Sequence, residues 1–103
     1  MFLDRDGNPI ETKEFIEKLS DWNYTVVGKE KFPTAESNVL VLTIWTGLVA
    51  EENTFDDVPY IYETIIRGGE MSGYRVLYSD EFEAVTGHMH AVEMAKEKLA
   101  YGN

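Results

Sequence analysis

The sequence contains no cysteine and few basic residues. Nine Lys and Arg stand against 19 Asp and Glu, so the formal net charge of the 103 residues is −10. Without cysteine the chain can have no disulfide, no thiol nucleophile and no cysteine-based zinc or iron–sulfur site. Such a composition suits a reducing compartment, and we expect a cytoplasmic protein that works without a metal or other cofactor.

Long apolar runs are absent as well. The longest, residues 39–44, is far shorter than the roughly 20 residues of a membrane-spanning helix, and no basic-then-apolar signal peptide opens the chain. A strongly negative protein also repels phosphate groups, and no cluster of Lys and Arg offsets this charge. We therefore expect neither a membrane protein nor direct binding to nucleic acid.

The chain does contain enough apolar material for a folded core. Hydrophobic residues make up 44% of the sequence, with five Phe, six Tyr and two Trp. A chain of this length buries roughly 65% of the surface that it exposes when unfolded. Because no repeat or Pro- and Ser-rich linker divides the sequence, we predict a single domain over residues 1–103.

The spacing of apolar residues predicts two helices. The first covers residues 12–21. The second covers residues 80–100 after the N-cap Ser79, and its stripe follows alternating steps of three and four residues along Phe82, Val85, Met89, Val92, Lys96 and Leu99.

β-Branched and aromatic segments predict the strands. They lie at 2–3, from 24 toward 31, and over 39–46, 60–67 and 74–78, with a Gly-rich hairpin loop at 68–73 and an acidic loop at 48–58. Residues 39–46 are apolar on both faces and are the predicted central strand. The order β-α-β-β-β-β-α predicts an α+β fold, in which an antiparallel sheet of about four strands carries both helices on one face.

Acidic residues gather between Lys31 and Arg67, a stretch without any basic residue. One interpretation is a surface that binds a basic host protein, including a nucleic-acid-binding site that it occupies in place of DNA, because complementary fields speed and orient association. On this interpretation the partner-binding residues are Glu51, Glu52, Asp56, Asp57, Tyr60 and Tyr62. The alternative is a solvated loop that keeps the protein soluble.

Two polar residues are candidates for a buried pair. Glu63 lies in a strand among apolar neighbours, and His88 lies beside the stripe of the second helix. A buried carboxylate and imidazole can do acid–base chemistry, but no nucleophile or recognised pocket accompanies them, so we predict no catalytic residue and no enzyme. His88 and His90 point about 200° apart on a helix, so they cannot share a metal ion, and we predict no metal site.

Several aromatic residues fall on strands that we expect to be neighbours. Such a cluster either forms an exposed sheet face, suited to a protein partner or a homodimer, or belongs to the core. Its members are Trp45, Tyr60, Tyr62, Tyr74 and Tyr78.

Three strings of residues resemble a family of small uncharacterised proteins encoded by phages and prophages. They are the W-x-G-L strand end at Trp45–Leu48, the P-x-I-aromatic-E-T strand from Pro59, and the Y-S-x4-A-x2-G-H helix start from Tyr78 to His88. After Leu48 this chain has Val-Ala-Glu-Glu where the family pattern has an Asp-His pair. The resemblance implies a phage protein that acts in the bacterial cytoplasm, and it implies no particular activity.

These observations leave three hypotheses of function. The first is a non-enzymatic inhibitor of a host defence protein, acting through the acidic surface. The second is a homo-oligomer that binds a small ligand such as a nucleotide signal, with Arg67 and Arg75 as the phosphate-binding residues. The third is a phage structural or assembly component.

Overall fold

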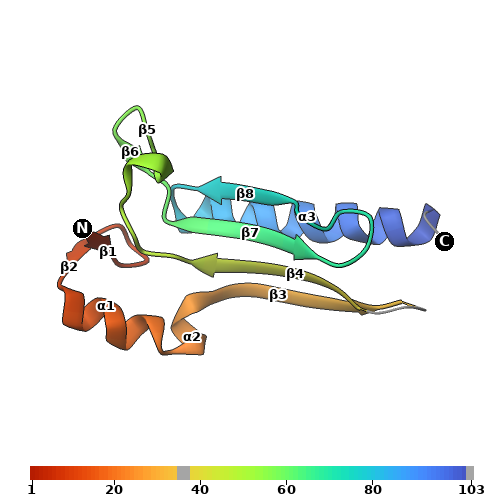
Figure 1. Cartoon of the computed structure of the whole chain (residues 1–103), viewed down its shortest axis with the longest axis horizontal. Coiled ribbons are helices and arrows are strands. Elements are labelled where there is room, and N and C mark those ends of the chain that lie inside the picture. The colour runs from red at the N-terminus through yellow and green to blue at the C-terminus, as the bar shows by residue number, and fades with distance from the viewer. Residues whose placement is uncertain (35–37, 102–103) are drawn as a thin grey trace.

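A computed structural model describes residues 1–34 and 38–101, and its centre is an antiparallel sheet. Within these residues the sheet has four strands in the order β3-β4-β7-β8: β3 (Val26–Pro33), β4 (Asn38–Trp45), β7 (Tyr62–Arg67) and β8 (Arg75–Tyr78). The long helix α3 (Glu81–Tyr101) runs behind the sheet in Figure 1. The predicted α+β fold is therefore confirmed, with the predicted central strand in an interior position.

Shorter elements lie at one end of the sheet. They are β1 (Phe2–Leu3), β2 (Pro9–Ile10), α1 (Thr12–Leu19) and α2 (Trp22–Thr25). The helix predicted over 12–21 ends at Leu19, because the Asp21 carboxylate accepts a hydrogen bond from the Asn23 amide and caps a separate short helix. Phe15 of α1 packs on Trp45, with 5.6 Å between the ring centroids.

The segment predicted as an acidic loop contains regular structure. Its elements are the 3-10 turn η1 (Glu51–Asn53) and the short strands β5 (Thr54–Phe55) and β6 (Val58–Pro59), which pair as a hairpin. The hairpin stands out from the end of the sheet in Figure 1.

Alternation along β4 and β7 divides their side chains between two faces. One face carries four buried residues of β4, which are Val39, Val41, Thr43 and Trp45. The last three pair across the strands with Ile66, Thr64 and Tyr62 of β7, which lie on the same face. This face packs on α3, where Val41 and Ile66 form a cluster with Ala91 and Ala95. Trp45, Tyr62 and Tyr78 are therefore core residues, and the alternative of an exposed aromatic face is wrong for them.

Helix α3 meets the sheet through its smallest residues. Ala84, Ala91 and Ala95 are buried, and a Cβ atom at Gly87 would clash with the Tyr78 hydroxyl. The apolar stripe that predicts the helix lies mostly away from this contact, since Phe82 is 80% and Met89 64% exposed. Small residues allow the helix axis to approach the sheet closely. The face of α3 that carries them is therefore the buried one.

Within the described residues, no helix is long and apolar enough to cross a membrane.

Candidate interaction surface

The predicted acidic residues lie on η1 and on the β5–β6 hairpin that follows it, which together are called the acidic hairpin here. Glu51 and Glu52 begin η1, and Asp56 and Asp57 form the two-residue turn between the paired residues Phe55 and Val58. All four carboxylates are exposed. The structure thus places these four predicted residues on one continuous segment at the end of the sheet, two on η1 and two at the tip of the β5–β6 hairpin.

The base of the hairpin is held by backbone and side-chain hydrogen bonds. The Tyr60 amide donates to the Asn53 carbonyl at 2.7 Å, and the Thr54 hydroxyl donates to the Ala50 carbonyl at 2.8 Å. These bonds close the segment across its base. The tip is therefore presented by an ordered structure, although the sequence predicts a loop.

The turn itself has an unusual backbone. Asp56 and Asp57 have φ angles of 51° and 64°, and they are the only non-glycine residues with positive φ in the described parts of the chain. A two-residue hairpin turn of this kind usually contains Asn-Gly or Asp-Gly, because side chains with a Cβ atom are strained there. Two consecutive carboxylates at this position cost stability, and such strain is common at binding sites.

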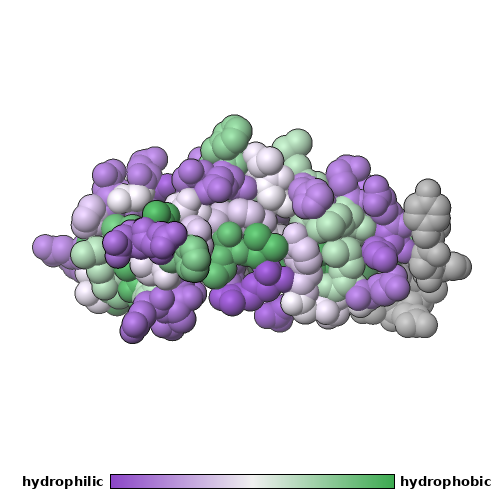
Figure 2. Space-filling model, turned by 90° about the horizontal axis from the view of Figure 1, so that it is seen from above, coloured by the Kyte–Doolittle hydropathy of each residue, from purple (hydrophilic) through white to green (hydrophobic). Residues whose placement is uncertain are grey.

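Apolar side chains adjoin the carboxylates at the tip. Phe55 is 67% exposed and Val58 43% exposed. Figure 2 views the molecule from above and shows hydrophilic side chains directly beside hydrophobic ones at the left, where the hairpin lies in Figure 1. Sequence reasoning did not single out the exposed Phe55 as part of this surface, because its only signal is its position as an isolated aromatic residue among acids.

The two predicted tyrosines differ from the acids. Tyr60 is half-buried at the base of the hairpin, whereas Tyr62 is completely buried and donates a hydrogen bond from its hydroxyl to the Arg5 carbonyl at 2.6 Å. Burial raises the pKa of Tyr62 to about 12. The assignment of Tyr62 to a partner-binding surface is therefore wrong, because its strand position faces the core.

The predicted pair of Glu63 and His88 does not form. The two residues lie on opposite faces of the sheet, because Glu63 alternates with the buried Tyr62 and Thr64. Glu63 pairs with Arg75 at 2.9 Å, and His88 is instead bound through Nδ1 to the Thr43 hydroxyl at 2.7 Å.

Thr43 continues this polar chain to Thr64 on the neighbouring strand, and both threonines are fully buried. Burial lowers the pKa of His88 below its usual value, and the carboxylate of Glu30 acts in the opposite direction. A hydroxyl that no solvent or substrate reaches is not a usable nucleophile. The arrangement therefore has the character of a buried structural network, which links β4, β7 and α3.

Arg67 and Arg75, the candidates for binding a small ligand, lie on the sheet face opposite α3. Arg67 is paired in register with Leu40, and Arg75 with Ile65, so the two arginines are diagonal neighbours on adjacent strands. Both are exposed, and Arg75 holds the ion pair with Glu63.

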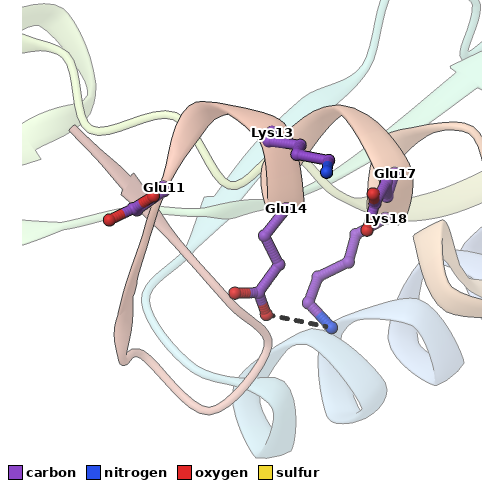
Figure 3. A pocket seen from close by; sticks show the side chains of 5 residues that line it. All are labelled: Glu11, Lys13, Glu14, Glu17 and Lys18. Atoms are coloured by element: carbon purple, nitrogen blue, oxygen red, sulfur yellow. Dashed lines mark ion pairs between the residues drawn. The ribbon is translucent and has the colours of Figure 1, made fainter.

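A shallow hollow on α1 is lined by charged side chains. Figure 3 shows Glu11 and Lys13 pointing in different directions, while Glu14 and Lys18 turn toward each other and form an ion pair of 3.6 Å. All these residues come from one short helix and the position before it. Because their side chains do not converge on a common point, the hollow has no arrangement suited to catalysis.

Among the described residues, no group of three or more His, Asp or Glu side chains is placed to hold a metal ion. No family model, no curated protein and no solved structure matches this chain.

Proposed function

We propose that this protein is a non-enzymatic binding protein, which attaches its acidic hairpin to a basic surface of a partner protein. The observation that carries the proposal is the composition of the hairpin tip. An exposed phenylalanine stands beside two carboxylates that are held in a strained turn. A solvated loop whose only role is solubility needs neither the exposed ring nor the strain.

The physical chemistry of the tip suits recognition. The carboxylates of Glu51, Glu52, Asp56 and Asp57 attract and orient a basic partner. Phe55 offers a rigid apolar anchor that loses little conformational entropy on binding. The tight turn fixes these groups before the encounter, which reduces the cost of ordering them.

The proposal includes the setting that the sequence resemblance implies. The protein is then phage-encoded and acts in the bacterial cytoplasm, and its target is a host protein with a nucleic-acid-binding surface, such as a defence protein. Carboxylates of the hairpin take the places that DNA phosphates occupy on that surface. The chain's overall negative charge supports this arrangement.

Neutralising the hairpin without changing its turn tests the proposal. The variant combines Glu51→Gln, Glu52→Gln, Asp56→Asn and Asp57→Asn, because Asn adopts positive φ as readily as Asp. The matched control removes four exposed carboxylates elsewhere: Glu11→Gln, Glu17→Gln, Glu70→Gln and Glu97→Gln. Both variants change the net charge by the same amount.

Native mass spectrometry of the tagged proteins, purified from a bacterial lysate at moderate ionic strength, reports the bound partner and its stoichiometry. We expect the wild type and the control to retain one basic protein. The hairpin variant should retain at least about ten-fold less of this partner, and Phe55→Ala should also reduce the amount of bound partner, although it does not change the charge. Equal losses in both four-residue variants would show that only net charge matters. A wild type without a partner also contradicts the proposal.

A DNA duplex added to the purified complex tests the mimicry. If the hairpin occupies a nucleic-acid site, the duplex displaces the protein in a concentration-dependent manner. Simultaneous binding of both would refute the DNA-mimic part of the proposal and leave the binding surface intact.

A further inference from the structure

The sheet face opposite α3 is apolar at its centre. Antiparallel sheets with one face in water normally alternate apolar and polar side chains along each strand. β4 does not, since Leu40, Leu42 and Ile44 occupy the positions that point away from α3. Ile65 of β7 lies beside Leu42 on the same face. No helix of the described chain covers this face, which is turned toward the viewer in Figure 1.

Basic residues border this apolar centre on both sides. One row across the strands reads Lys31, Leu40 and Arg67. The adjacent row on the same face reads Lys29, Leu42, Ile65 and Arg75.

Four of the nine basic residues therefore share one face of a protein whose net charge is −10. Among the described strand residues, Glu63 is the only acidic one on this face, and it is already paired with Arg75.

We propose that this open face binds an acidic amphipathic helix of a partner protein. Lys31 and Arg67 are separated by two strand spacings, about 10 Å, which matches the width of one α-helix. A helix lying along β4 sets its apolar stripe on the two leucines and on Ile65. Carboxylates on both borders of that stripe then reach the cations of β3 on one side and of β7 and β8 on the other.

Charge decides between this occupant and others. Two copies of the chain packed through this face would bring their basic borders together, which is repulsive. Single-stranded nucleic acid is bound on sheets largely through stacking on aromatic rings, and the four strands place only aliphatic side chains at the centre of this face. An acidic helix satisfies both the apolar centre and the cationic borders, and it uses a surface separate from the hairpin.

The probes are designed peptides of about 18 residues, because a helix of that number of residues is about as long as strand β4. The first carries Leu along one stripe, Glu on both borders and Gln on the outer face, and the second replaces Glu with Gln. Fluorescence anisotropy in about 0.1 M salt measures their dissociation constants. We expect the Leu/Glu peptide to bind at least about ten-fold more tightly than the Leu/Gln peptide, with amide NMR shifts confined to β4 and its neighbours.

Charge reversal on the two borders supplies the decisive variants. Lys29→Glu with Arg67→Glu reverses one exposed cation on each side, and Lys13→Glu with Lys98→Glu makes the same change of charge elsewhere. We expect the first pair of substitutions to raise the dissociation constant of the Leu/Glu peptide at least about ten-fold, and the second pair to raise it less than about two-fold. Circular dichroism melts of each pair show that the fold is kept. The hairpin variant described above binds this peptide as the wild type does, which separates the two surfaces.

Three results would overturn the proposal. The first is equal binding of the two peptides, and the second is an equal loss in both charge-reversal pairs, which would reflect the overall field alone. The third is self-association in analytical ultracentrifugation that Lys29→Glu with Arg67→Glu abolishes, because the occupant would then be a second copy of the chain.

Discussion

A methyl group at Gly28 is expected to destabilise the protein only while the ring of His88 is present. Gly28 lies in β3 opposite Thr43, and a Cβ atom there would approach His88 Cδ2 and Nε2 to 2.6 Å. Such contacts are much shorter than van der Waals distance. The φ angle of Gly28 is not in the left-handed region, so the backbone itself accepts alanine. The Gly28→Ala variant therefore isolates a steric effect between β3 and α3.

The expected magnitude follows from two opposing terms. Inserting a methyl group into a packed site costs about 1–3 kcal/mol. Replacing glycine by alanine inside a strand gains about 0.5–1 kcal/mol, because the unfolded chain loses conformational freedom. In the wild type the steric term wins, and Gly28→Ala lowers the free energy of unfolding. In a His88→Ala background the ring is absent, so the same substitution raises it.

Urea denaturation followed by circular dichroism gives the four free energies of this double-mutant cycle. The cost of His88→Ala, including the lost hydrogen bond to Thr43, cancels in the cycle. The gain from replacing glycine is the same in both backgrounds and cancels, so we expect a coupling energy equal to the steric term, about 1–3 kcal/mol, and a change of sign for Gly28→Ala. An equal cost of Gly28→Ala in both backgrounds would refute the contact between β3 and the imidazole.

Two further predictions concern His88 and the acidic turn. Because burial lowers the pKa of His88, the unfolded chain binds more protons than the folded one as the pH falls below the ordinary value of 6.5, so the free energy of unfolding should fall there. Denaturation at a series of pH values should show this loss, and a His88→Gln variant should not. Asp57→Gly should stabilise the protein by about 1 kcal/mol, because glycine has no Cβ atom and adopts positive φ without strain. A melting temperature that does not rise would show that the turn is unstrained.

Much of the sheet was predictable because it depends on local composition. β-Branched and aromatic residues locate β4, β7 and β8, and the period-two geometry of a strand places Tyr62, Thr64 and Ile66 on the face opposite Glu63 and Ile65. The bounds of these strands differ from the predicted ones by at most two residues. The acidic tip was predicted as a surface but not as a hairpin, because Asp-Asp is not a typical sequence for a two-residue turn.

The buried face of α3 was harder to predict, because it depends on contact between distant segments. Periodicity gives weight to large side chains such as Phe82 and Met89, whereas the helix packs through Ala84, Ala91 and Ala95. Nothing in the sequence around Gly87 says that Tyr78 fills the space beside it. The partner of His88 is likewise decided by which strand residue lies beneath it in three dimensions.

The buried threonines also determine how the two central strands align. A slip of β7 along β4 by two residues would keep every side chain on its own face, and both strands are apolar enough to tolerate it. After such a slip Thr43 would oppose Ile66 or Tyr62 in place of Thr64. The two hydroxyls would no longer meet, and a buried polar group without a partner costs about 1–3 kcal/mol. The threonine pair thus specifies the register of β4 and β7, because it favours one alignment among several that hydrophobicity alone would allow.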